Sequence, residues 1–99
     1  MFSAKEAREQ SNRANMKRAQ EFLWNEGSKE IQTAIDNGHY NCVLNISNLK
    51  YPEWIGPFIA QILKENYGFE ADYVNSYQDD TNHYIFVDWY ERPKEVGLA

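Results

Sequence analysis

Residues 54–67 read WIGPFIAQILKENY, and the prediction of the fold depends on them. Their apolar side chains recur at steps of three and four residues, while Gln61, Lys64 and Glu65 fall on the other side. That spacing predicts an amphipathic helix over Trp54–Tyr67 with one buried face. Pro57 fits the first turn if the regular helix starts near Gly56, and would bend the helix if it starts at Pro52. Gly68 is expected to end it.

Three segments around this helix have the pattern of β-strands. Residues 39–47 alternate apolar and polar side chains, which predicts a strand with one buried side. Residues 69–77 read as a more polar strand, and a turn over residues 78–82 leads to residues 83–90. This last strand is apolar on both sides, so it is expected to be central. We therefore predict an α+β fold: a long N-terminal helix, then a β-α-β-β unit whose three-stranded antiparallel sheet has the order 1-3-2 and helices packed on one face.

The long helix is predicted to precede the first strand. Ser3 and Glu6 form a capping box, which marks its start. One apolar stripe continues past Gly27 to Asp36, so the helix either runs unbroken or ends near Gly27 and restarts. In residues 1–20 the apolar side chains are mostly alanines, which offer little surface to bury. We expect this part to form an arm that projects or packs loosely.

Length and charge define two parts of one domain. The 99 residues are enough for a single α+β domain, in which residues 39–90 form the sheet and helix body. Residues 1–20 carry five basic and two acidic side chains, a net charge of +3. Residues 21–99 carry five basic and thirteen acidic ones, a net charge of −8. The acidic body argues against nucleic acid as a partner, because phosphate binding depends on Lys and Arg.

Candidate catalytic residues are few. Cys42, the single cysteine, lies on the inward side of its predicted strand and reads as a core residue rather than a nucleophile. His39 and His83 each precede a tyrosine, without the neighbours that a catalytic unit needs. No spacing fits a metal, a nucleotide or another cofactor. We predict a chain that is not an enzyme, in a reducing cytoplasm, without signal peptide or membrane span.

Two surfaces are candidates for binding. The sheet face opposite the helices is predicted to hold more apolar surface than a monomer leaves in water, formed by Val43 and by the binding residues Tyr73, Tyr77, Tyr84, Phe86 and Tyr90. A second copy of the chain, the leading helix folded back, a partner protein or a stacked ligand would cover it. The second surface is the basic side of the leading helix, with Arg8, Arg13, Lys17 and Arg18.

Five short motifs are spread along the chain: Ala4-Lys5-Glu6-Ala7-Arg8, Ala34-Ile35-Asp36-Asn37-Gly38, Tyr40-Asn41-Cys42-Val43-Leu44, Tyr67-Gly68-Phe69 and Tyr84-Ile85-Phe86-Val87-Asp88-Trp89. Together they resemble small phage-encoded α+β accessory proteins of mostly unassigned activity. The resemblance covers most of the chain, and each motif is short and structural. It implies a non-structural phage product in the cytoplasm of a bacterial host, and it supplies no catalytic residues.

These patterns lead to two functional hypotheses from different classes. In the first, the chain is a non-enzymatic accessory protein that binds and inhibits a bacterial host protein, as a homo-oligomer, through the acidic body and the exposed aromatic residues. In the second, it sequesters a small nucleotide-type signalling ligand, with tyrosines stacked on the base and the basic helix in contact with the phosphates. An unrecognised enzyme is the third alternative.

Overall fold

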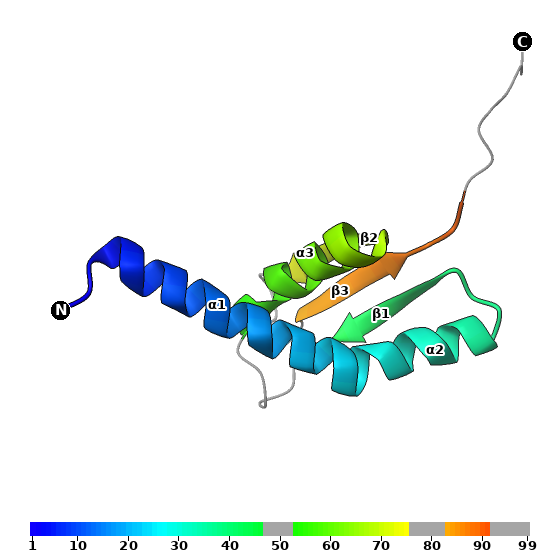
Figure 1. The fold of residues 1–99 in the computed structure, drawn as a ribbon. Coiled ribbons are helices and arrows are strands. Elements are labelled where there is room, and N and C mark those ends of the chain that lie inside the picture. Colours follow the sequence, from blue (N-terminus) through cyan, green and yellow to red (C-terminus); the bar gives the residue numbers. More distant parts are fainter. Residues whose placement is uncertain (47–52, 76–82, 92–99) are drawn as a thin grey trace, which may run out of the picture.

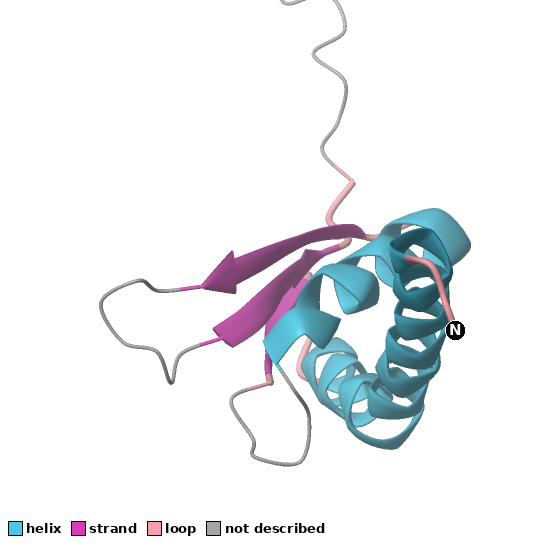
Figure 2. Ribbon diagram, turned by 90° about the vertical axis from the view of Figure 1, so that its left-hand side faces the viewer, coloured by secondary structure: helices cyan, strands magenta, loops and turns pink. Residues whose placement is uncertain are grey.

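The computed structural model describes residues 1–46, 53–75 and 83–91, which form one three-stranded sheet with helices on one of its faces (Figures 1 and 2). The α+β architecture predicted from the sequence is confirmed. In chain order, the elements are α1 (Ala4–Phe22), the π-helical turn η1 (Leu23–Gly27), α2 (Ser28–Asp36), β1 (Asn41–Asn45), the 3-10 turn η2 (Glu53–Ile55), α3 (Gly56–Tyr67), β2 (Glu70–Asn75) and β3 (His83–Asp88).

The leading helix is continuous from Ala4 to Asp36, which decides between the two alternatives at Gly27. Five residues, Leu23–Gly27, form a π turn within it, and the backbone amide of Ser28 donates to the carbonyl of Leu23. The Ser28 hydroxyl also donates to the carbonyl of Trp24, at 2.9 Å. A π turn fits an extra residue into one turn of helix without breaking it. The helix therefore passes Gly27 without a new cap.

The first part of α1 projects from the body (Figure 1). The Ser3 hydroxyl accepts a hydrogen bond from the backbone amide of Glu6, at 3.1 Å, as the predicted capping box requires. All residues from Ala4 to Ala14 are exposed, and this segment is called the arm below. Further along α1, Ala19 and Phe22 are buried and anchor the helix to the core.

The sheet has the predicted order, with β3 between β1 and β2 and antiparallel to both. The register pairs Leu44 with Ile85 and Ile85 with Tyr73, so these three side chains lie on one face. Leu44 and Ile85 are fully buried there, beneath the helices. This is the helix face of the sheet. The opposite face, which no described helix covers, is called the open face (Figure 2).

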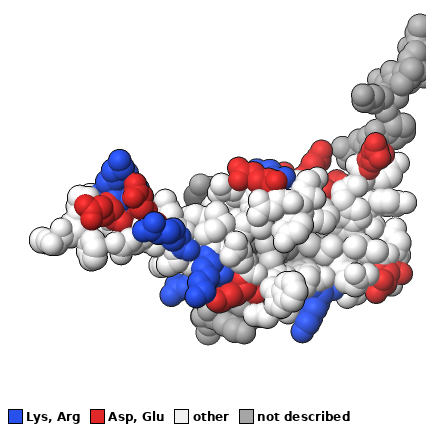
Figure 3. All heavy atoms as spheres, in the orientation of Figure 1, with Lys and Arg blue, Asp and Glu red and all other residues white. Residues whose placement is uncertain are grey.

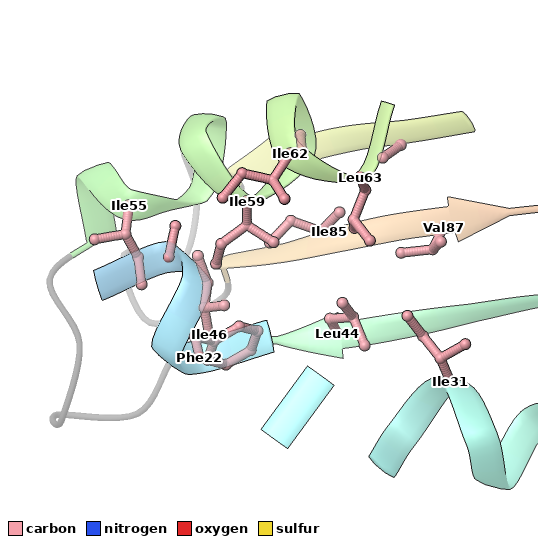
Figure 4. Packing of buried hydrophobic residues seen from close by; sticks show 13 residues of the cluster. Phe22, Ile31, Leu44, Ile46, Ile55, Ile59, Ile62, Leu63, Ile85 and Val87 are labelled. Atoms are coloured by element: carbon pink, nitrogen blue, oxygen red, sulfur yellow. The ribbon is translucent and has the colours of Figure 1, made fainter. Parts of the chain in front are cut away.

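The core lies between the helix face and α3, with contributions from α1 and α2 (Figure 4). Helix α3 buries one side, as its spacing predicts, through Ile59, Ile62 and Leu63. Pro57 falls in its first turn, where a missing backbone amide costs no hydrogen bond. Gly68 ends the helix with φ at 74°, in the left-handed region, and its amide donates to the carbonyl of Leu63.

Replacement of Gly68 by alanine is expected to lower the free energy of unfolding by about 1–2 kcal/mol, the cost of a left-handed backbone for a residue with a Cβ. Nothing lies within 4 Å of a Cβ built at this position, so only the backbone conformation contributes. Urea unfolding followed by circular dichroism measures the effect. Gly68→Asn should cost less, because asparagine tolerates this conformation. Equal losses in the two variants would contradict the explanation.

Candidate functional site

The open face holds a small apolar patch beside acidic side chains. By register, Val43 lies beside Phe86, and Tyr84 lies beside Val74. Val43 is 50% exposed and Phe86 37% exposed, while Tyr84 and Val74 are half-buried. Glu70, Asp72 and Asp88 lie on the same face, and the first two are exposed. The open face is therefore apolar in the middle and negatively charged along β2.

The structure places the five predicted aromatic residues in different surroundings. Tyr84 and Phe86 lie on the open face, as expected. The prediction for Tyr73 is wrong, because its register with Ile85 puts it on the helix face, where it packs against the core. Tyr77 lies outside the described residues. Tyr90 follows the end of β3 and contacts Tyr40 edge to face, with ring centroids 5.0 Å apart.

Tyr73 instead forms a structural pair with His83. The Tyr73 hydroxyl shares a hydrogen bond of 2.9 Å with Nδ1 of His83, and the two rings are stacked at an interplanar angle of 4°. His83 is buried, so this bond satisfies a polar group that water does not reach. The pair joins the two strands that meet at this end of the sheet. The described aromatic residues therefore do not form the single broad surface that the sequence predicted.

The basic residues of α1 are exposed, as a projecting helix requires. Arg8, Arg13, Lys17 and Arg18 all lie at the surface. Figure 3 shows basic side chains along the projecting helix, with acidic ones among them, while most of the surface of the body in this view is uncharged. Arg8 and Arg13 belong to the arm. Lys17 borders a groove that the sequence analysis did not predict.

This groove lies beside the π turn, among α1, α2 and α3. Its volume is about 810 Å³. It is lined by Lys17, Gln20, Glu21, Leu23, Trp24, Asn25, Ser28, Ile31, Gln32, Ile62, Leu63, Asn66, Tyr67 and Phe69. We refer to the hollow lined by these residues as the helix-side groove. Most of the surface of the body in the view of Figure 3 is uncharged.

Two large aromatic side chains stand at the helix-side groove with little cover. Trp24 is 83% exposed and Tyr67 is 68% exposed. Ile62 and Leu63 of α3 are buried in the core beneath them, and Leu23 and Phe69 are half-buried. Tryptophan and tyrosine are the residues that most often anchor a bound protein. The exposure of both at one apolar hollow makes it the strongest candidate binding site in the described part of the chain.

The groove results from the way the leading helix crosses the body. Its first half, α1, packs against α3, whereas its second half, α2, packs on β1. The hollow therefore lies at the point along the leading helix where contacts with α3 end and contacts with the sheet begin. Sequence spacing gives the buried side of each helix, but not the angle between them. One sequence feature could have indicated the groove. Leu23 and Trp24 are adjacent large apolar residues, and one narrow helical stripe cannot bury both side chains.

The groove offers chemistry for binding rather than a recognisable set of reacting groups. Its polar members are amides and a hydroxyl, from Gln20, Asn25, Ser28, Gln32 and Asn66, together with Lys17 and Glu21. Amides and hydroxyls donate and accept hydrogen bonds, so they can fix the orientation of a bound molecule. In the described residues, no three His, Cys, Asp or Glu side chains are grouped so that they could hold a metal ion.

Cys42 lies outside the groove, half-buried at the edge of the core. Burial raises the pKa of its thiol, and the negative charge of Glu30 raises it further. Iodoacetamide should therefore modify Cys42 more slowly at neutral pH than it modifies an exposed cysteine, because the thiolate is the reactive form. Glu30→Gln removes the charge, so it is expected to lower the pKa and to speed the reaction at neutral pH, because more of the thiol is then ionised. A rate that is unchanged across the pH profile would contradict this assignment.

Among the described residues, no helix combines the length and the apolar character that crossing a membrane requires. Comparison of the chain with protein-family models, with curated proteins and with solved structures found no match in any of the three. The functional argument therefore rests on the fold and on the helix-side groove.

Proposed function

We propose that the protein is a non-enzymatic binding protein that inhibits a bacterial host protein by holding one of its helices in the helix-side groove. The observation that carries this proposal is the pair of exposed aromatic residues, Trp24 and Tyr67, at one apolar hollow. Grooves between helices receive amphipathic helices through apolar side chains spaced three and four residues apart. The phage-type setting of the proposal comes from the motifs described in the sequence analysis.

The chemistry of the groove and its surroundings defines the partner helix. Half of the lining residues are aliphatic or aromatic, and most of the exposed lining surface is apolar, so we expect the bound side of the helix to be apolar. The chain from residue 21 onward is acidic as a whole, with a net charge of −8 over residues 21–99. Basic side chains on the flanks of the partner helix would be attracted to this body, which favours association and disfavours acidic competitors. We therefore expect an amphipathic helix with an apolar stripe and basic flanks.

Site-specific photo-crosslinking in bacteria tests the proposal. A benzophenone amino acid is placed at Trp24, at Tyr67 and, as a control, at Trp54, which is exposed but does not line the groove. The expected result is that the same bacterial protein crosslinks from both groove positions and not from Trp54, and that peptide mapping places the crosslinks on one amphipathic helix. Crosslinks only to other copies of this chain, or equal crosslinking from all three positions, would overturn the proposal.

A second function, the sequestration of a small nucleotide-type ligand, is favoured by one observation. Lys17 and Trp24 line the same groove, so an aromatic surface for stacking and a cation for a phosphate lie in one hollow. This function predicts an ultraviolet-absorbing small molecule that copurifies from infected cells and is released on denaturation. Protein prepared in this way without any such molecule would count against it.

A further inference from the structure

The arm cannot cover the open face of its own chain. It is the start of a continuous helix whose later residues, Ala19 and Phe22, are fixed in the core. The arm extends away from the body in Figure 1, and the leading helix runs along the side of the sheet opposite the open face in Figure 2. A rigid helix does not reverse its direction without a break. An arm can therefore cover the open face only if it belongs to another molecule.

Lys5 and Arg8 give the arm a predominantly basic side. Lys5, Arg8 and Asn12 are spaced three and four residues apart, so they lie on one side of the helix. Glu6, Glu9 and Arg13 are spaced in the same way and lie on another side, where opposite charges neighbour each other. All of these residues are exposed. Lys5 and Arg8 thus present positive charge to solvent, and Glu9, four residues after Lys5, borders the same side of the helix.

We propose that the arm of one copy of this chain docks on the open face of a second copy, with Lys5 and Arg8 against Glu70 and Asp72. The two surfaces have opposite charge, and both are exposed in the structure. The apolar middle of the open face, formed by Val43, Tyr84 and Phe86, receives the aliphatic stems of the basic side chains and the alanine side of the arm. In this arrangement the protein is a homo-oligomer, held together by contacts between the arm of one copy and the open face of another.

The dimensions of the two surfaces match. The eleven helical residues Ala4–Ala14 extend roughly 16 Å at 1.5 Å per residue. Strands of five or six residues, such as β1 and β3, extend roughly 17–20 Å, and three strands are about 14 Å wide. A helix of about 10 Å diameter fits across this surface. One docked arm covers less than the ~800 Å² per partner of a standard interface, so reciprocal docking of two arms is the arrangement we expect.

Charge also disfavours one alternative, the packing of two open faces with β2 against β2. Glu70 and Asp72 of one copy would then lie near Glu70 and Asp72 of the other, and like charges across an interface are destabilising. The helix-side groove is a poorer receptor for the arm, because its lining is largely apolar and the arm is largely polar. The open face is the described surface that complements the arm in both charge and size.

Analytical ultracentrifugation of the full chain tests the proposal. We expect a dimer at about 0.05 M NaCl that dissociates as the salt concentration rises to about 0.5 M, because screening weakens exposed charge pairs. Arg8→Glu and Asp72→Lys are each expected to weaken the dimer at least about tenfold. The two changes combined in one chain restore the opposite charges, so they should recover much of the affinity. Arg13→Glu, on the other side of the arm, is the matched control and should have no effect.

Three outcomes would overturn the proposal. The first is a chain that stays monomeric at low salt over the whole accessible concentration range. The second is a dimer that Arg8→Glu, Asp72→Lys and Arg13→Glu weaken equally, which would indicate a general effect of net charge. The third is a monomeric chain whose arm binds a 20-nucleotide DNA probe and loses this binding in Arg8→Glu, which would assign the arm to nucleic acid. None of these variants alters the helix-side groove, so crosslinking from Trp24 tests the proposed function separately.

Discussion

Replacement of Trp24 by alanine is expected to weaken binding of the partner helix by about 30- to 700-fold, or about 2–4 kcal/mol, while the protein stays folded. The magnitude follows from the position of the side chain. Trp24 is 83% exposed in the free protein, so its indole ring contributes little to folding and is available for burial by a partner at the groove. Tryptophans in such positions account for the largest losses in alanine scans of interfaces.

The measurement is a fluorescence-anisotropy titration with a labelled peptide that spans the helix mapped by crosslinking. Trp54→Ala is the matched control, because Trp54 is also an exposed tryptophan, 58% exposed, with its Nε1 donating to Oδ1 of Asn15 at 3.1 Å. Trp54 does not line the groove, so its replacement should change the affinity by less than about threefold. Similar losses in the two variants would mean that the groove does not define the binding site.

Replacement of Gly56 by alanine is expected to lower the free energy of unfolding by about 3 kcal/mol. Gly56 is the buried first residue of α3, and a Cβ at this position would overlap the ring of Tyr73. Tyr73 cannot yield freely, since its hydroxyl is hydrogen-bonded to the buried His83. Overpacking of a core typically costs about 1–3 kcal/mol, and a disrupted buried hydrogen bond adds about 1–3 kcal/mol. Thermal unfolding should show a midpoint lower by roughly 12–24 °C.

Two variants separate this explanation from a general intolerance of alanine. Gly27→Ala introduces the same methyl group into the π turn, where the nearest side-chain atom is Cδ2 of Leu23 at 3.0 Å, which can move. The higher helix propensity of alanine, about 1 kcal/mol, offsets that contact, so we expect a change of less than about 1 kcal/mol. In a Tyr73→Ala background, Gly56→Ala should cost little, because the ring is gone. An equal cost in both backgrounds would exclude the contact with Tyr73 as the cause.

The elements of the fold were predictable because each depends on local spacing. The apolar residues of α3 recur at helical steps, and the strand that contains Ile85 and Phe86 is apolar on both sides, which identifies it as central. The capping box at Ser3 and the positive φ at Gly68 are likewise properties of a few neighbouring residues. The junction at Gly27 was the exception, since the sequence did not show whether the helix continues there. Over such a short segment, the apolar stripe does not distinguish a π-helical turn from an α-helical one.

The candidate site was predictable only in part. For Tyr84 and Phe86, strand alternation assigned the correct face. It failed for Tyr73 because β2 turns the small Ala71 and the large Tyr73 toward the helices while Val74 lies on the open face, so the size of a side chain does not indicate its face. The helix-side groove was missed for another reason. It depends on the angle at which the leading helix crosses α3, which is set by long-range packing and leaves no periodic trace in the sequence.

The π turn has a further consequence for how this protein could change over time. Residues Leu23–Gly27 place one more amino acid between the arm and α2 than an uninterrupted α-helical path would need. Loss of a single codon there, for example that of Asn25, would turn the π-helical segment into an α-helical one and rotate the helix before it relative to α2. Loss or regain of one codon would therefore change how the indole of Trp24 is presented at the groove.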